Sequence, residues 1–124
     1  GAGIGAAVWG TLLDRVRAER GALLLEIESP HARGLAPGER EVRLRRARFY
    51  TRLGARQLRV PAFAVPDASD PAAAPLPMLL MAAPARRAAM PAAAARALVA
   101  DLYRASYGLE PDHPLPRRAL ASAR

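Results

Sequence analysis

The residues best suited to chemistry form a glycine-rich stretch at the start of the sequence. The stretch consists of Gly1, Ala2, Gly3, Ile4, Gly5 and Ala6. Glycines allow a backbone to approach a ligand closely and to take positive φ, and the first turn of a helix offers unpaired N–H groups with a partial positive charge. The stretch therefore predicts a turn that holds an anion such as a phosphate group, although ordinary tight turns also contain glycine.

An amphipathic helix that ends at Arg20 must position this turn. Its apolar residues recur every four positions, and Gly21 supplies a C-terminal cap. The side chains expected to face inward are those of Ile4, Val8, Leu12, Leu13 and Val16. Residues 22–28 then alternate as a strand, which has one wholly apolar face and two carboxylates at the end of the other.

A second helix is predicted for residues 39–53, after a loop at 29–38. Gly54 caps it, and the side expected to face inward carries Val42, Phe49, Tyr50 and Leu53. Glutamates and arginines four residues apart, such as Glu39 with Arg43, are typical of an exposed helix face.

The rest of the chain predicts two strands and a third helix. Residues 57–65 are expected to form a strand interrupted by Pro61, and residues 78–82 a buried strand. A helix opens at Pro91 and runs to about residue 107, with Leu98, Val99 and Leu102 facing inward. The whole order predicts an α/β (α+β) domain in which helices flank a sheet.

Composition excludes several classes of function. The net charge is +8, but all 19 basic residues are arginine in a chain without lysine, asparagine or cysteine, which is typical of a GC-rich genome. The high isoelectric point is therefore poor support for nucleic-acid binding. The lack of cysteine excludes a thiolate nucleophile, and His31 and His113 are too isolated to indicate a metal site. Neither a membrane span nor a signal peptide is visible, so a cytoplasmic protein is expected.

Three segments in order resemble the GNAT superfamily of N-acetyltransferases. They are Gly1-Ala-Gly-Ile-Gly5, Leu25-Glu-Ile-Glu28 and Arg48-Phe-Tyr-Thr-Arg-Leu-Gly54. The family has a pyrophosphate-binding turn of the form Arg/Gln-x-x-Gly-x-Gly/Ala, and a later helix that carries Phe-Tyr before a Leu-Gly cap. Ala55 stands where the family usually has phenylalanine, and the asparagine that often precedes Phe-Tyr is absent.

This resemblance covers residues 1–82 and implies a GNAT-like mixed sheet. The leading Arg or Gln of the turn, and the first strands of the family, would precede Gly1. We therefore expect residues 1–108 to be the C-terminal portion of such a domain, which would need its upstream half. Residues 109–124 are rich in proline and arginine without apolar periodicity, and we expect a flexible tail there.

The resemblance also implies roles for individual residues. The amides of residues 1–6 would hold the pyrophosphate of acetyl-CoA, and Tyr50 would protonate the departing CoA thiolate. Glu26 and Glu28 are candidates for receiving the proton of an amine acceptor or for binding a cationic one, and pairing with arginines explains them equally well. The acceptor is not identified, no metal is implied, and a homo-oligomer is left open.

Two alternatives remain at this point. The glycine pattern, with Glu28 closing the next strand, also fits an NAD(P)-binding unit of Rossmann type. A non-catalytic basic module for nucleic acid or an acidic partner is the second alternative. The Phe-Tyr helix with its Leu-Gly cap is left unexplained by the NAD(P)-binding alternative, whereas the binding module differs from the acetyltransferase in predicting indifference to Tyr50→Phe.

Overall fold

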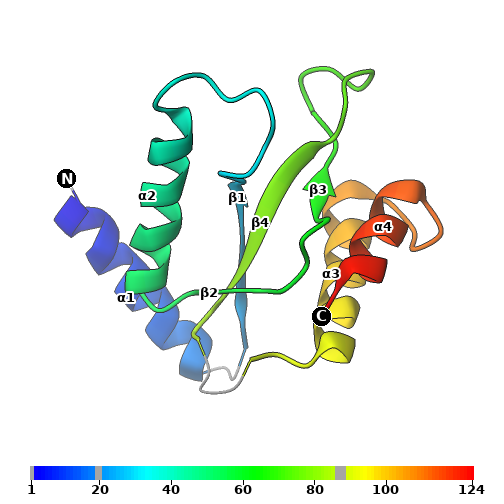
Figure 1. The fold of residues 1–124 in the computed structure, drawn as a ribbon. Helices are drawn as coiled ribbons and strands as arrows, with labels where there is room; N and C mark the ends of the chain where they lie inside the picture. The colour runs from blue at the N-terminus through cyan, green and yellow to red at the C-terminus, as the bar shows by residue number, and fades with distance from the viewer. Residues whose placement is uncertain (1, 19–20, 86–88) are drawn as a thin grey trace.

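A computed structural model describes residues 2–18, 21–85 and 89–124, with the backbone alone for residues 2–6 and 17. It has helices on both sides of a small sheet (Figure 1). The elements in chain order are α1 (Ala2–Ala18), β1 (Leu23–Glu28), α2 (Glu39–Arg52), β2 (Arg56–Gln57), β3 (Ala64–Val65), β4 (Leu76–Ala83), α3 (Ala92–Tyr107) and α4 (Pro114–Ser122). The α+β class predicted from the sequence is confirmed.

Strand β4 is the centre of the sheet. It pairs along its length with β1, from Leu23 opposite Ala83 to Glu28 opposite Met78. Its other edge pairs with β2 and, further along, with β3. Every described pair is antiparallel, so the prediction of a mixed sheet was wrong for these strands. The reason is that β4 returns between β1 and β2 and runs opposite to both.

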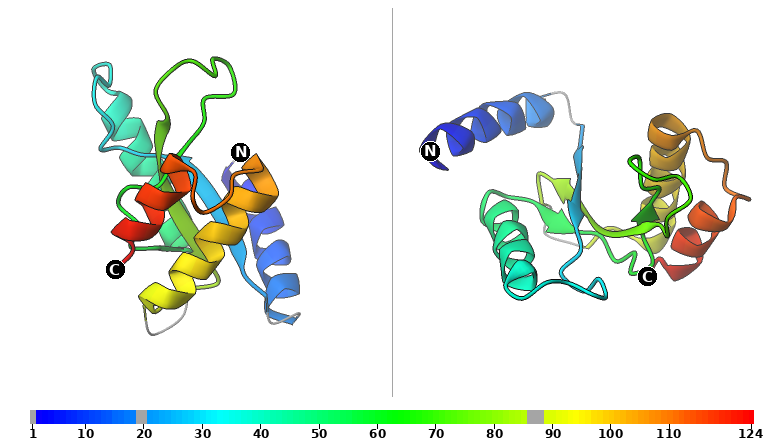
Figure 2. Two further views of the ribbon diagram at one scale, coloured as in Figure 1. Left: turned by 90° about the vertical axis from the view of Figure 1, so that its right-hand side faces the viewer. Right: turned by 90° about the horizontal axis from the view of Figure 1, so that it is seen from above.

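Each face of the sheet carries its own core. Seen from above, α1 and α2 lie to one side of the strands and α3 and α4 to the other (Figure 2). The core on the α1 and α2 side contains Leu13, Ile27, Ala55, Leu79, Met81 and Ala83. The core on the α3 and α4 side contains Leu58, Val60, Phe63, Val65, Leu80, Ala82, Ala95, Val99, Tyr103, Leu115 and Ala119. Strand alternation explains the division, because neighbouring residues of β4 point to opposite faces.

The segment predicted as one strand at residues 57–65 is two short strands joined by a turn. The Phe63 N–H donates to the Val60 carbonyl at 3.0 Å, and Pro61 lies inside that turn without a backbone donor of its own. The turn directs Phe63 into the core, where its side chain is 1 % exposed. The turn thus buries an aromatic ring in place of the ladder bonds that a continuous strand would have made.

The flexible tail predicted for residues 109–124 was also wrong, because α4 forms there. His113 caps it by accepting the Leu115 N–H on Nδ1 at 3.1 Å, and Pro114 occupies a first-turn position where a missing N–H costs nothing. Leu115 and Ala119, four residues apart, are buried against the core beside α3. The apolar stripe of α4 is so short that its periodicity could not be recognised in a stretch rich in proline and arginine.

The inward face of α1 differs from the prediction. Leu13 is buried as expected, but Val8 is 65 % exposed and Leu12 39 % exposed. The indole Nε1–H of Trp9 donates to the Leu53 carbonyl at 2.7 Å and so sets the rotation of α1. On α2, Val42 is likewise exposed rather than inward.

Candidate functional site

The predicted anion-binding turn is helical where it is described. Gly1 lies outside the described residues, and Ala2, Gly3, Ile4, Gly5 and Ala6 are the first residues of α1. The prediction of a glycine turn was therefore wrong for residues 2–6. The first N–H groups of a helix still lack intrahelical acceptors, so this end of α1 keeps the donors that the anion-binding hypothesis requires.

Tyr50 lies on the face of α2 that contacts α1. Its ring packs at 5.4 Å, centroid to centroid, from the ring of Trp9 and at the same distance from that of Phe49. The side chain is half-buried at the border of the core that contains Leu13. Within the described part of the chain its hydroxyl makes no hydrogen bond.

The end of α2 is shaped to let α1 approach. Leu53 and Ala55 donate their N–H groups to the Tyr50 carbonyl at 3.1 and 3.0 Å, which holds the backbone at Tyr50 in place. Gly54 has φ of 95°, and a Cβ there would lie 3.6 Å from Leu13 Cδ1. Glycine is favoured mainly by the left-handed backbone. The Leu-Gly cap thus supports the α1–α2 contact that surrounds Tyr50.

Glu26 faces the opposite side of the sheet and is bound by α3. The Tyr107 hydroxyl donates to Glu26 Oε2 at 2.5 Å, and Tyr103 lies beside Tyr107 with ring centroids 6.2 Å apart. Burial, and then the hydrogen bond to the Glu26 carboxylate, raise the pKa of Tyr107 well above its ordinary value. Glu26 is therefore held by a protonated phenol.

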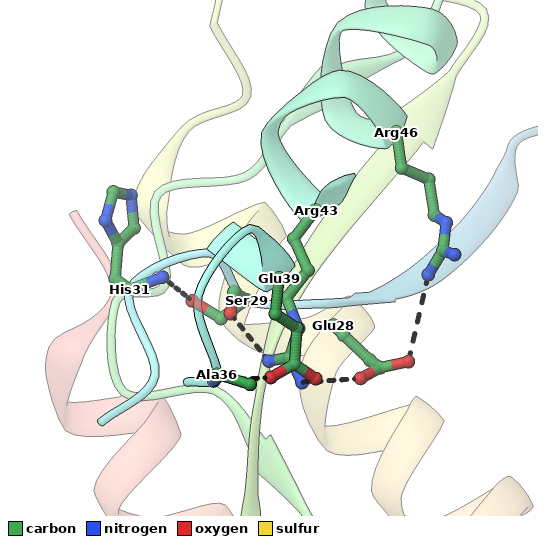
Figure 3. A network of polar contacts seen from close by, with 7 residues as sticks. All are labelled: Glu28, Ser29, His31, Ala36, Glu39, Arg43 and Arg46. Carbon is green, nitrogen blue, oxygen red and sulfur yellow. Dashed lines mark hydrogen bonds and ion pairs between the residues drawn. The ribbon is translucent and has the colours of Figure 1, made fainter. Parts of the chain in front are cut away.

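Glu28 belongs to a network with the first half of α2 (Figure 3). Arg43, whose side chain is 14 % exposed, places Nη2 2.7 Å from Glu28 Oε2 and 3.2 Å from Glu39 Oε1. Its Nη1 donates to the Ser29 carbonyl at 2.9 Å. Arg46 approaches Glu28 at 3.7 Å. The network ties the loop after β1 to α2, and the predicted Glu39–Arg43 pair is confirmed within it.

The three candidate catalytic residues therefore do not form one cluster. Tyr50 contacts α1, Glu28 contacts the start of α2, and Glu26 contacts α3 across the sheet. Sequence reasoning missed Trp9 and Tyr107 as partners of these residues. The spacing of Tyr103 and Tyr107 by four residues was the available signal, since it places both rings on one face of α3.

The two histidines differ in their surroundings. The His113 imidazole caps α4, whereas His31 is exposed and its backbone N–H, not its ring, donates to Ser29 Oγ at 3.1 Å. Across residues 2–18, 21–85 and 89–124, no group of three or more His, Cys, Asp or Glu residues could hold a metal ion. Over the same ranges, no helix has the length and apolar character needed to cross a membrane.

No protein-family model matches the chain, and neither the curated proteins nor the solved structures contain a match.

Replacing Arg43 with glutamine should lower the free energy of unfolding by about 1–3 kcal/mol, because it leaves the buried Ser29 carbonyl without its donor. Urea unfolding monitored by circular dichroism measures the change. Arg46→Gln is the matched control on the same helix, and its exposed, longer ion pair should contribute less than about 0.5 kcal/mol. Equal effects of the two variants on the free energy of unfolding would contradict the conclusion that Arg43 is the main stabilising residue of this network.

The raised pKa of Tyr107 makes stability depend on alkaline pH. A group whose pKa is higher in the folded state contributes stability below its unfolded pKa, near 10 for tyrosine, and loses that contribution as pH rises toward the folded value. The free energy of unfolding should therefore fall above about pH 10. The fall should be shallower in Tyr107→Phe, which lacks the titrating group, although burial raises the pKa of Tyr103 as well. Parallel curves from urea unfolding across this range would refute the assignment.

Proposed function

We propose that this protein is a GNAT-type N-acetyltransferase that moves an acetyl group from acetyl-CoA to an amine. The observation that carries the proposal is the contact between α1 and Tyr50 on one face of the sheet. The glycine-rich start of α1 and the Phe-Tyr segment of α2 are far apart in the sequence, and the ring of Trp9 joins their helices at Tyr50.

In this proposal residues 1–6 remain the pyrophosphate-binding segment, and within α1 the donors are the amides of residues 2–5, which lack intrahelical acceptors. Trp9 lies seven residues after Ala2, which is about 10 Å along a helix axis. A catalytic group beside Trp9 is therefore well removed from the pyrophosphate, as the extended arm of CoA requires. The ligand would run along the α1 side of the sheet toward Tyr50.

The chemical step is an attack of the amine nitrogen on the thioester carbonyl carbon. The carbon–sulfur bond breaks, the departing thiolate takes the proton of the Tyr50 hydroxyl, and the attacking amine gives up a proton to a base. A hydroxyl that has no hydrogen bond within the described chain is available for this donation. Glu28 is the sequence-predicted candidate for that base, but it pairs with two arginines of α2 and does not cluster with Tyr50, so we assign no residue to the base.

The alternatives differ in what they require of the fold. An NAD(P)-binding unit needs parallel strands around its glycine turn, and all described pairs are antiparallel. A basic binding module predicts steep loss of affinity with salt and indifference to the Tyr50 hydroxyl.

Calorimetric titration of the protein with acetyl-CoA, with NAD as the control ligand, tests the cofactor directly. Saturable binding of acetyl-CoA with no binding of NAD supports the proposal. A folded protein that binds NAD and not acetyl-CoA would overturn it. Truncated ligands, such as pantetheine without the diphosphate, should bind more weakly if the amides of α1 hold the pyrophosphate.

A further inference from the structure

The surface of α2 carries an open groove of about 520 Å³. All of its described lining residues belong to this helix, and they are Leu44, Arg45, Ala47, Arg48, Thr51 and Arg52. Tyr50 is not among them, because it stands two residues from both Arg48 and Arg52 and residues two apart lie on different sides of a helix. The groove is therefore separate from the α1–α2 contact around Tyr50.

Three arginines form a row along this groove. Arg45, Arg48 and Arg52 stand three and then four residues apart, which places them on one side of the helix over a rise of about 10 Å. All three residues are exposed. Within the part of the chain that the structure describes, their guanidinium groups make no ion pair and no hydrogen bond. The row is thus a concentrated positive charge with no counter-charge among the described residues.

The other arginines of α2 show how this helix uses a guanidinium to stabilise the fold. Arg43 and Arg46 both point toward Glu28, at 2.7 and 3.7 Å from its carboxylate oxygens (Figure 3). They connect α2 to the end of β1. The row of three makes no comparable connection, so the structure of the described chain does not account for its position.

The floor of the groove is apolar and selects among acidic partners. Leu44 and Ala47 line it, and both are half-buried. A phosphodiester backbone has no apolar group for this floor, and no aromatic side chain is among the described lining residues to stack on a base. Glu41, one turn before Arg45 on the same side of the helix, would also repel a phosphate. An acidic amphipathic helix supplies both carboxylates and apolar side chains.

We propose that this face of α2 is a docking surface for an acidic amphipathic helix of a partner protein. Carboxylates of the partner, three and four residues apart, contact Arg45, Arg48 and Arg52, and an apolar side chain between them lies on Leu44 and Ala47. Each exposed ion pair contributes little alone, so the affinity depends on the three together and falls as salt is added. Because Tyr50 lies outside this surface, docking leaves the proposed acetyl-transfer site open.

The first test is an NMR titration of the full 124-residue chain with a synthetic peptide of about 16 residues, long enough to form a helix in water. Its glutamates stand three and four residues apart with leucine on the same face, and a second peptide has glutamine in place of each glutamate. The acidic peptide should bind saturably, shift the amide signals of residues 44–52, and bind about tenfold more tightly than the glutamine peptide, as three exposed ion pairs together imply. Equal binding of the two peptides would overturn the proposal. So would a short DNA duplex that binds this face more tightly than the acidic peptide.

Two variants of equal charge locate the site. Arg48→Gln combined with Arg52→Gln should weaken binding of the acidic peptide about fivefold. Arg117→Gln combined with Arg118→Gln removes the same charge from exposed positions on α4 and should weaken it less than about twofold. Circular dichroism checks that both variants are folded. Equal losses in the two variants would mean that net charge alone attracts the peptide, and would refute the docking surface.

Charge reversal tests the pairing directly. Arg48 is the middle residue of the row, so it faces the middle glutamate of the peptide in either orientation of the partner helix. Arg48→Glu should weaken binding of the acidic peptide, and a peptide with lysine at the middle position should recover most of the lost affinity for this variant. A lysine peptide that binds the variant no better than the acidic peptide does would contradict the proposed contact.

Discussion

Replacing Tyr50 with phenylalanine is expected to slow acetyl transfer about 100-fold, at the lower end of what a general acid contributes. The reason is that the thiolate would then leave without the proton of the phenol. The ring itself remains, so its packing against Trp9 should persist. Because the hydroxyl makes no hydrogen bond within the described chain, the free energy of unfolding should change by less than about 0.5 kcal/mol. Steady-state turnover and acetyl-CoA affinity should be measured on the same preparation.

The matched control is Tyr103→Phe, which removes a phenol from the other face of the sheet. The Tyr103 hydroxyl donates to the Ala64 carbonyl at 2.6 Å and is fully buried. Its loss should therefore lower stability by about 1–2 kcal/mol and leave turnover unchanged. If Tyr50→Phe turns over at the normal rate, Tyr50 is not the acid. If both variants lose activity equally, the effect reports on the fold and not on chemistry.

Replacing Ala119 with aspartate should be the most damaging single substitution for stability. Ala119 is completely buried between α4 and the core that contains Tyr103. A carboxylate there would lose its hydration without gaining a designed partner, which costs about 3–5 kcal/mol. That is a large part of the 5–15 kcal/mol by which domains are typically stable. Thermal and urea unfolding should both show it.

Ala121→Asp is the control on the same helix, because Ala121 is exposed. It should change the free energy of unfolding by less than about 0.5 kcal/mol. Two equally mild variants would mean that α4 does not dock on α3 in solution. The pair therefore also tests the helix that replaced the predicted tail.

The sequence predicts the fold best where the hydrophobic periodicity of a helix agrees with the residues that begin and end it. Helix α3 shows this: Pro91 precedes it, Gly108 ends it with φ of 64°, and the expected Val99 is buried. Rotation of a helix about its axis is harder, because it depends on which partner is present. Val8 and Leu12 fit the apolar stripe of α1, yet both are exposed, because the Trp9–Leu53 hydrogen bond turns Trp9 inward beside the correctly predicted Leu13. Hydrophobic periodicity does not show that a tertiary hydrogen bond such as Trp9–Leu53 can determine the rotation of a helix at the cost of leaving two apolar side chains exposed.

The candidate site likewise has features that depend on local sequence, which could be predicted, and features that depend on tertiary contacts, which could not. The Phe49-Tyr50 segment and its Gly54 cap could be located from the sequence, because both depend on local structure. The partners of Glu26 and Glu28 could not, because strand alternation alone puts both carboxylates on one face. In the structure Tyr107 binds the first from α3 and Arg43 binds the second from α2. These contacts depend on how the helices cross the sheet, which short motifs do not encode.

The pairing of β1 with β4 has a consequence for how the chain folds as it is made. Residues 23–28 pair with residues 78–83, so each partner lies 50–60 residues away along the chain. Ribosomes add about 5–20 residues per second, so the synthesis of β4 follows that of β1 by roughly 3–12 s. During that interval the apolar run Leu23-Leu-Leu25 has no described strand to cover it. Charged residues beside such runs suppress aggregation. Glu26 and Glu28 supply two such charges next to this run while Tyr107 and Arg43 are not yet in position to bind them.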